Sequence, residues 1–284
     1  MAVLIDYGDD WRSGYVDLVH RLADNPDGAV DSRVGFTHEI TDFMFTLSPD
    51  AIDLPLGVGR KISTALAAAE AIQLCAGVAM PELTEAVAAR VASFVRDKDG
   101  TVHGNYGGRV DMQIIDVVDK LRADPMSRQA IIQIWDAGLD SQYRDPMPRD
   151  IPCTIAIGLL IRGGALQMSV TMRSNDAWLG TPYDVFQFRQ LQRTIARQLG
   201  RPIGQYVHHA YSMHLYDKDL GAARGLSVDA AWQPNGPFPD GLYAARAAAL
   251  PSAMLSCLVG KNLDSESHEW YHARLGEAYA RLHA

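Results

Sequence analysis

The sequence predicts an α/β protein, because both strands and helices can be recognised in its hydrophobic pattern. Residues 155–161 form a short apolar run, residues 162–164 read Arg-Gly-Gly, and residues 166–172 alternate apolar and polar side chains. This order is typical of two antiparallel strands joined by a glycine turn. Residues 64–76 are rich in alanine, and residues 83–97 carry apolar side chains at spacings of three and four, so both segments are expected to be helices.

The remaining elements follow from the same patterns. Further helices are expected over residues 15–23, 114–121 and 183–199, and further strands over residues 130–135 and 207–216. Gly77 and Gly200 directly follow two of the predicted helices and are suited to end them. A chain of 284 residues with 48% hydrophobic residues can bury a sizeable core, and no linker divides it. We therefore expect one domain over residues 1–284.

Composition argues against several classes of function. A formal net charge of -8 and a pI near 5.5 do not suit a nucleic-acid surface, which needs clustered Lys and Arg. No apolar run approaches the ~18 to 20 residues of a membrane span, and the first residues lack a signal-peptide core. The three cysteines are widely spaced and form no Cys-x-x-Cys, so neither a disulfide framework nor a zinc site is expected. This pattern fits a reducing cytoplasm.

Three histidines lie close together in the predicted strand over residues 207–216, but they do not suggest a metal site. Side chains alternate along a strand, so His208 and His214 are expected to point opposite to His209. We therefore expect no metal.

The most informative segment runs from Ile151 to Asp184. Cys153 follows a proline just before the first strand of the hairpin, and period-two alternation places Arg173 on the polar face at the end of the second strand. Asp176 and Asp184 lie in the turn and the helix start that follow. The pattern places one thiol, one cation and two acids at the ends of strands and in a turn.

This segment resembles the thymidylate synthase family, whose nucleophile lies in a Pro-Cys-His and whose nucleotide site reads Gln-Arg-Ser-x-Asp, then Leu-Gly-x-Pro-Phe-Asn. The residues that the chain shares with these motifs are Pro152, Cys153, Arg173, Ser174, Asp176, Leu179, Gly180 and Pro182. The resemblance covers about residues 33–222 and is most specific over residues 151–184. It implies the thymidylate synthase fold, a large mixed sheet covered by helices, and a homodimer formed through the sheet face. It also implies a nucleotide substrate and 5,10-methylenetetrahydrofolate as co-substrate, with Asp176 binding the pterin.

The base-recognition position of the family carries Asn, whereas this chain has Asp184. An Asn amide both donates and accepts hydrogen bonds, which suits uracil, while an ionised carboxylate only accepts, which suits the N4 amine of cytosine. Asp at this position resembles the deoxycytidylate and cytidylate hydroxymethylases, which finish with water in place of hydride. The alternative is an acid that only stabilises a helix start, worth about 0.3 to 1 kcal/mol.

Glu70 is the only charged residue of the alanine-rich helix. We expect it to be buried, which is costly without a partner. The family motif His-Glu-Leu-Leu-Trp-Phe-Leu-x-Gly is matched by Glu70 and Gly77, with Gln73 in place of Trp. The resemblance implies that Glu70 is an acid/base acting through ordered water, and the alternative is a structural ion pair.

Residues 103–109 form a glycine-rich loop that resembles the Tyr-Gly loop of the family. The resemblance implies that Tyr106 removes the C5 proton of the pyrimidine. His103 is a rival for this role, because an unperturbed histidine has a pKa near neutrality.

The resemblance also implies how the phosphate is held. Arg33, Arg173 and Ser174 would bind it within one subunit, and Arg128 would reach the phosphate of the partner subunit. Gln129 replaces a second family arginine. For Arg33 and Arg128 the alternative is a surface cation without a partner.

His214 and Tyr216 match the Asp-x-His-x-Tyr motif whose His and Tyr hold the sugar hydroxyl in the family, with Ser212 in place of Asp. These residues would position the ribose or deoxyribose of the substrate.

The predicted activity is that of a pyrimidine nucleotide 5-hydroxymethyltransferase. Cys153 would add to C6 of dCMP or CMP, C5 would take the methylene of 5,10-methylenetetrahydrofolate, and water would complete the product. Three alternatives remain: a CMP-specific hydroxymethylase of nucleoside natural-product synthesis, a thymidylate synthase that acts on dUMP and tolerates Asp184, and a non-catalytic nucleotide-binding homologue.

Overall fold

The computed structural model describes residues 3–32, 35–98, 100–143 and 147–229. Its centre is a mixed sheet of eight strands, in which β1, β3, β8, β6, β5 and β4 are neighbours in this order, β2 pairs with β3, and β7 pairs with β8. The strands are β1 (Val3–Asp6), β2 (Gly28–Ser32), β3 (Gly35–Leu47), β4 (Ala130–Gln133), β5 (Thr154–Arg162), β6 (Ala165–Met172), β7 (Asn175–Asp176) and β8 (Ile203–Tyr216). The predicted large mixed sheet is confirmed.

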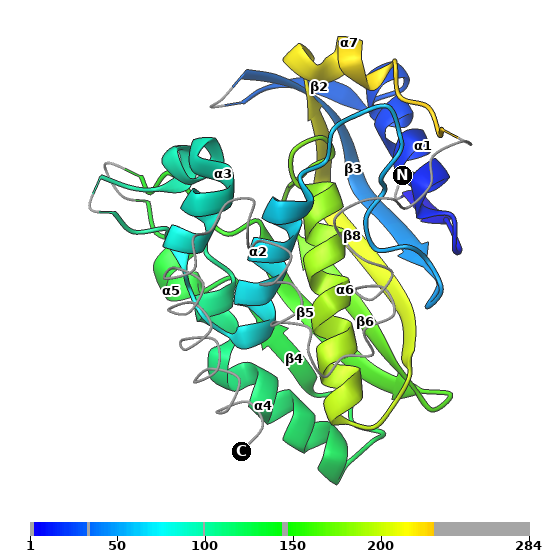
Figure 1. Cartoon of the computed structure of the whole chain (residues 1–284), viewed down its shortest axis with the longest axis vertical. Helices are drawn as coiled ribbons and strands as arrows, with labels where there is room; N and C mark the ends of the chain where they lie inside the picture. The colour runs from blue at the N-terminus through cyan, green and yellow to red at the C-terminus, as the bar shows by residue number, and fades with distance from the viewer. Residues whose placement is uncertain (1–2, 33–34, 99, 144–146, 230–284) are drawn as a thin grey trace.

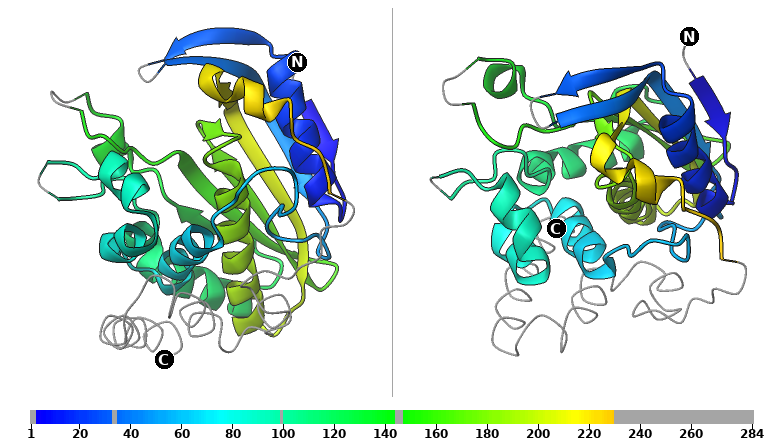
Figure 2. Two further views of the ribbon diagram at one scale, coloured as in Figure 1. Left: turned by 45° about the horizontal axis from the view of Figure 1, so that its top comes forward. Right: turned by 90° about the horizontal axis from the view of Figure 1, so that it is seen from above.

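Helices α2, α4 and α6 lie together on one face of this sheet, and α1 lies beside β3 (Figure 1). The view from above shows the same layering (Figure 2). The helices are α1 (Trp11–Asp24), α2 (Thr64–Ala76), α3 (Pro81–Val95), α4 (Gly107–Ala123), α5 (Ala137–Asp140), α6 (Thr181–Gln198), α7 (Leu220–Ala223) and the 3-10 helix η1 (Asp217–Asp219). Across the described residues, no helix is both long and apolar enough to cross a membrane.

The predicted hairpin is present, and its turn has a clear cause. Strands β5 and β6 pair antiparallel up to Arg162 and Ala165, and Gly163 and Gly164 join them with φ values of 59° and 80°. Only glycine adopts this left-handed backbone without strain, so the turn fixes the register of both strands. That register places Thr154, the residue after Cys153, opposite Met172, the residue before Arg173.

The two helices that flank the site begin and end for local reasons. The Ser63 side chain accepts a hydrogen bond from Leu66 N at the start of α2, and Gly77 closes the helix with a φ of 64°. Helix α6 places Phe188, Leu191 and Ile195 in the core, as its spacing predicts. Burial of this stripe against the sheet holds the first turn of α6, and hence Asp184, in place.

The β2–β3 hairpin was not predicted. Every residue of β2 from Gly28 to Asp31 is exposed, so the strand lacks the apolar alternation by which a strand is recognised. Its pairing with β3, from Gly28 opposite Glu39 to Ser32 opposite Gly35, stabilises it instead. Arg33, a predicted phosphate ligand, lies outside the described residues.

The alternation of buried side chains reverses along β8. Ala210 is buried before the reversal, and Met213 and Leu215 are buried after it. The pairing with β3 keeps its register across this point, and Asp42 of β3 has a positive φ of 49° there. His208 is therefore in the core while His214 is only half-buried on the other side. The expectation that these two histidines share a face was wrong, because it assumed an unbroken period of two.

Candidate active site

Four elements carry the three predicted catalytic residues and the predicted base-recognition residue Asp184. Cys153 directly precedes β5, Glu70 lies in α2, Tyr106 precedes α4 and Asp184 lies in the first turn of α6. Burial raises the pKa of Glu70, Tyr106 and Cys153, and the charge of Asp184 raises all three further. Because such effects fall with distance, these side chains form one site.

Arg173 holds the chain that carries Cys153. Its backbone N–H donates to the Cys153 carbonyl at 2.8 Å, and its guanidinium donates to the carbonyls of Pro152 at 3.0 Å and Ile151 at 2.9 Å. Burial raises the pKa of the Cys153 thiol to about 11, and the Arg173 cation opposes this increase without reversing it. The thiol is therefore protonated at neutral pH in the unliganded protein, and Arg173 alone does not activate it.

Glu70 has an enclosed side chain that water still reaches in part. Burial raises its pKa to about 8, and the charges of Asp184 and Asp150 add to the shift. No cation pairs with Glu70 among residues 3–229 as described, so the structure gives no support to the structural ion pair. A carboxyl group with a pKa near neutrality is suited to exchange protons with substrate or water.

Asp184 is buried, and two amides contact its carboxylate. Asn175 Nδ2 donates to Oδ2 at 2.7 Å, and Gln187 Nε2 donates to Oδ1 at 3.1 Å. Burial raises the pKa of Asp184 to about 7 against the opposing effect of these two donors. Asp184 is 8% exposed, so its carboxylate is largely removed from solvent along with the rest of the first turn of α6.

Tyr106 is placed by a close approach of three segments. A side chain at Gly107 would collide with the backbone carbonyls of Gln73 and Val78, so the loop reaches α2 only because this residue is glycine. The Tyr106 ring stacks on Phe188 of α6 at 6.1 Å. Burial raises the pKa of its hydroxyl well above the usual value, so the phenol is neutral near pH 7.

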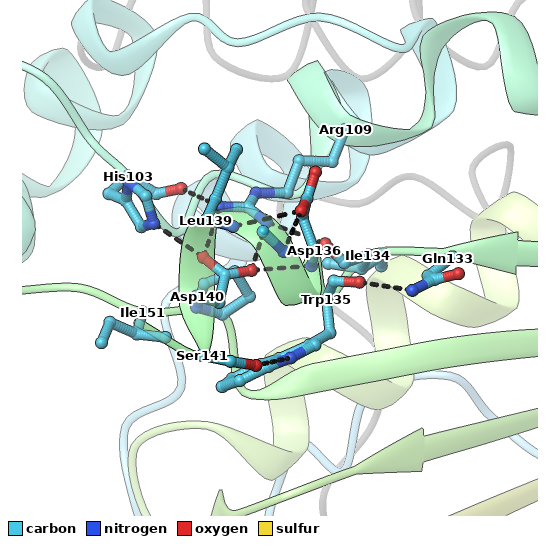
Figure 3. Close-up of polar contacts among 12 residues, drawn as sticks. His103, Arg109, Gln133, Ile134, Trp135, Asp136, Leu139, Asp140, Ser141 and Ile151 are labelled. Atoms are coloured by element: carbon cyan, nitrogen blue, oxygen red, sulfur yellow. Dashed lines mark hydrogen bonds and ion pairs between the residues drawn. The ribbon is translucent and has the colours of Figure 1, made fainter. Parts of the chain in front are cut away.

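His103 is held in an ionic network that anchors the same loop (Figure 3). Its Nε2 lies 2.7 Å from Asp140 Oδ1, and Arg109 binds both Asp140 oxygens, at 2.6 and 3.0 Å. Arg109 also donates to the His103 carbonyl at 2.9 Å. The structure thus engages the rival base His103 with Asp140, while Tyr106 shares the electrostatic environment of Cys153 and Asp184.

Asp150 is a further acid of the site that the sequence reasoning missed. A side chain at Gly104 would collide with its carboxylate, so glycine makes room for it. Burial raises the pKa of Asp150, and Arg173 opposes this most strongly. Its charge also contributes to the raised pKa of Cys153. An acid in an irregular segment two residues before Pro152 gave no signal of this placement.

The predicted sugar ligands are adjacent to the end of the hairpin. Ser174 Oγ lies 3.4 Å from His214 Nδ1, and the His214 and Tyr216 rings meet edge to face at 5.4 Å. Strand β7 places Asp176 opposite His214. Ser212 donates to Glu39 rather than pointing to this group.

Asp176, the predicted pterin ligand, shapes the turn before α6. Its Oδ1 accepts hydrogen bonds from the backbone of Trp178 at 2.7 Å and Leu179 at 2.9 Å. The Arg60 guanidinium lies 4.1 Å from the centre of the Trp178 ring. The second carboxylate oxygen and this aromatic surface are suited to a flat polar ring such as a pterin.

Gln73, which stands where the family has Trp, is buried and hydrogen-bonded within the protein. It is 3% exposed, and its amide contacts Ala69, Thr84 and the backbone of Met80. Its amide oxygen also accepts a hydrogen bond from Asn105 Nδ2 at 3.0 Å, so Gln73 joins α2 both to the segment that follows and to the loop that carries Tyr106.

Arg128 is not brought to the site of its own chain. It is exposed just before β4, whose Ala130 pairs with Leu159 near the far end of β5. Leu159 lies six positions beyond Cys153 along the strand, or roughly 20 Å.

No group of three metal-binding side chains occurs in the part of the chain that the structure describes. The expected absence of a metal stays a prediction. Cys75 and Cys153 are free thiols.

Comparisons with known proteins agree with the geometry. The sequence profile of the family described as Thymidylate synthase matches residues 14–228. A thymidylate synthase of Bacillus licheniformis is 32% identical over 137 residues, which are 44% of this chain and 47% of that protein. A deoxyuridylate hydroxymethyltransferase of Bacillus phage SP01 is 36% identical over 111 residues, which are 39% of this chain and 28% of that protein. The alignments thus span about half or less of the length of these relatives.

Proposed function

Since the chain belongs to the thymidylate synthase family, we propose that it is a folate-dependent enzyme that transfers a one-carbon unit to C5 of a cytosine nucleotide, dCMP or CMP. The product would be the 5-hydroxymethyl nucleotide, formed with water, and tetrahydrofolate would be released. The observation that carries this proposal is the buried Asp184 at the base-recognition position.

Asp184 offers lone pairs to the base edge beyond those that Asn175 and Gln187 occupy, since a carboxylate accepts about four hydrogen bonds. Cytosine presents the N4 amine, which donates. When a thiolate adds to C6, negative charge develops toward N3, and protonation of N3 creates a second donor. A pKa of about 7 allows Asp184 to give that proton and then accept from both nitrogens as a carboxylate.

Cys153 would supply the nucleophile. Its thiol loses a proton, its sulfur forms a bond to C6, and C5 becomes able to attack the methylene carbon of 5,10-methylenetetrahydrofolate. Because burial holds the thiol pKa at about 11, deprotonation requires a base once the nucleotide is bound, and Glu70 is suited to receive the proton through water.

Tyr106 and Glu70 would complete the reaction. The C5 proton would pass to a water molecule that the neutral Tyr106 phenol holds by a hydrogen bond; the folate amine leaves, takes up a proton and departs as tetrahydrofolate, and an exocyclic methylene remains on C5. Water adds to this methylene, and the bond between Cys153 and C6 breaks. The overall balance is cytidine nucleotide plus methylenetetrahydrofolate plus water, giving hydroxymethyl nucleotide plus tetrahydrofolate, with no oxidation or reduction.

A second candidate is hydroxymethylation of dUMP. One observation favours it, namely 36% identity to a protein described as a deoxyuridylate hydroxymethyltransferase. A thymidylate synthase acting on dUMP would use the same nucleophile and differ only in taking hydride instead of water.

The direct test is to identify the products from dCMP, CMP and dUMP, each with methylenetetrahydrofolate, for the wild-type protein and for Asp184→Asn. We expect the wild type to hydroxymethylate a cytosine nucleotide. Asp184→Asn exchanges an acceptor for a donor at almost constant size, so kcat/KM for that nucleotide should fall by about 5- to 150-fold and dUMP should bind better. A wild type that prefers dUMP, or an Asn variant with unchanged base preference, would disprove the cytosine assignment.

We also propose a homodimer with shared active sites. The sheet face opposite α2, α4 and α6 carries half-exposed and exposed side chains, among them Ile131 at 50% and Tyr211 at 48% exposure. Pairing of two such faces would cover them and could carry the exposed Arg128 to the phosphate of the partner subunit.

Arg128→Ala should therefore raise the Kd for nucleotide in the homodimer. When Arg128→Ala chains are mixed with Cys153→Ala chains, hybrid dimers contain one intact site and should recover up to about half of the activity per dimer expected for two sites. Absence of any recovery in dimers that native mass spectrometry shows to be mixed would contradict the shared site.

The location and domain boundaries stay predictions. We propose a cytoplasmic protein because the mechanism needs Cys153 as a free thiol. A single domain over residues 1–284 remains our expectation.

A further inference from the structure

A series of buried hydrogen bonds leads from Tyr206 through His208 and Asn175 to Asp184. Tyr206 Oη lies 2.8 Å from His208 Nδ1, and His208 Nε2 lies 3.0 Å from Asn175 Oδ1. The Thr181 hydroxyl donates to the same Asn175 oxygen at 2.7 Å. Asn175 Nδ2 then donates to Asp184 at 2.7 Å. Four of these residues are at most 2% exposed, and Asp184 is 8% exposed.

The chemistry of these groups determines which of them donates and which accepts at each step of the series. Burial lowers the pKa of His208 to about 3, so its ring is neutral and has one donor nitrogen. Because Nε2 faces a carbonyl oxygen, Nε2 carries the proton and Nδ1 accepts from the Tyr206 hydroxyl. With the His208 ring and the Thr181 hydroxyl donating to its oxygen, the Asn175 amide presents its NH₂ group to Asp184.

The hydrogen bonds of this series can run in the opposite direction only if Asp184 is protonated. If the Asn175 amide turned over, its oxygen would face the Asp184 carboxylate, and this contact is favourable only when Asp184 is protonated and donates. The His208 ring would then need the opposite tautomer. The observed direction therefore favours Asp184 as an acceptor with a fixed orientation.

We propose that Asn175, oriented by His208 and Thr181, is a positioning residue that sets the base preference of the enzyme by holding Asp184 as a hydrogen-bond acceptor. This inference rests on the proposed function and deepens it. Asn175 occupies the variable position between Ser174 and Asp176, and the family motifs assign no role to it or to His208. The three residues act through Asp184 and need not touch the substrate.

The test measures binding rather than turnover. In a Cys153→Ser background, the Kd values for dCMP, CMP and dUMP are determined by calorimetry, and their ratio reports base preference. Asn175→Ala should reduce the preference for cytosine over uracil by about 10-fold, since a hydrogen bond to a charged group is lost. A folding defect alone would weaken the binding of all three nucleotides by the same factor and would leave the ratio of their Kd values unchanged.

A gentler variant guards against misfolding. His208→Phe keeps the stacked ring contact with Phe45 at 4.9 Å, and adding Tyr206→Phe leaves no phenol without a partner. This double variant removes one of the two donors that orient Asn175 and should reduce the preference by about 3-fold. In an Asp184→Asn background the same double change should alter the ratio of Kd values less, because Tyr206, His208 and Asn175 act on base preference through Asp184.

Gln192→Leu is the matched control. Gln192 lies on α6, the helix that carries Asp184, and is fully buried. Its amide donates to the carbonyls of Leu166 at 2.9 Å and Gly204 at 3.2 Å, away from Asp184. Its loss should lower the melting temperature and leave the Kd ratio unchanged. An equal shift in the ratio for Gln192→Leu would show that the ratio reports loosened packing and would overturn the positioning role.

The outcomes separate the two proposals. If the wild type prefers dUMP, the cytosine assignment fails, whereas the positioning role still requires the ratio to change in the Asn175 and His208 variants. An unchanged ratio in these folded variants would overturn the positioning role whichever base the wild type prefers. Should Asn175→Ala fail to fold, the double phenylalanine variant decides alone.

Discussion

Cys153→Ser is expected to abolish turnover while nucleotide binding persists. A serine hydroxyl is far less nucleophilic at neutral pH than a thiolate, and loss of a nucleophile in other enzymes reduces kcat by about 10⁶-fold. The site around it should survive, because Arg173 holds this segment through the carbonyls of Ile151, Pro152 and Cys153 and not through the sulfur. Product formation by chromatography and nucleotide Kd by calorimetry measure the two effects separately.

Cys75→Ser is the control for this experiment. Cys75 is a second free thiol, 2% exposed in α2, and burial raises its pKa to about 12. We expect this variant to lose some stability and to keep its rate per folded molecule. Turnover near the wild-type rate in Cys153→Ser would rule out the covalent mechanism.

Glu70→Gln is expected to lower kcat by about 100-fold or more, the usual effect of losing a general acid or base. Glutamine keeps the size of the side chain and removes its titration. No cation depends on Glu70 within the described ranges, so the fold should not suffer. Steady-state kinetics with the amount of folded protein measured independently gives the rate per folded molecule.

The same variant should become more stable than the wild type as pH rises. The unfolded chain releases the Glu70 proton near the ordinary value of 4.5, and the folded protein releases it at about 8. Between these two pKa values the folded state binds more protons than the unfolded state, so the free energy of unfolding of the wild type falls as pH rises. Above pH 8 it falls no further, because Glu70 is then ionised in both states. Glutamine carries no such penalty. Because the side chain is partly exposed, we expect a gain of on the order of 2 kcal/mol at pH 8, or several degrees in Tm.

These two readouts distinguish the roles considered for Glu70. An acid/base predicts lower activity with equal or higher Tm at pH 8, and a structural ion pair predicts lower Tm with normal activity per folded molecule. Melting curves at pH 4 and pH 8 provide the comparison, since the pH-dependent difference between variant and wild type is small below the unfolded pKa of 4.5.

The sequence predicted those parts of the fold that are determined by residues adjacent in the chain. Helix α2 ends at Gly77, as predicted, and the β5–β6 turn at Gly163 and Gly164 has the expected backbone. Strand β2 escaped prediction because its partner strand and not its own pattern stabilises it. Helix α3 likewise contains a non-helical residue, Ala88, that its apolar spacing does not indicate.

The candidate site shows the same division. Cys153, Glu70, Tyr106 and Asp184 could be named because each occupies a motif position, and the structure brings them together. Asn175, His208 and Asp150 could not be named in these roles, because they come together only through tertiary packing. Their contacts join strands and helices that are far apart in the sequence, as with Asn175 and His208, which are 33 positions apart.

The reversal of burial in β8 allows one strand to serve two opposite sides of the protein. Upstream of Tyr211, the strand places His208 in the interior beside Asn175, and downstream it presents His214 to Ser174. A regular strand would direct both histidines the same way, since they are six residues apart. The left-handed backbone at Asp42 on the neighbouring strand accompanies this change without shifting the register. Under the roles that we propose for Asp184 and His214, a single stretch of backbone links base preference to sugar binding, and changes that straighten the sheet here are expected to alter both together.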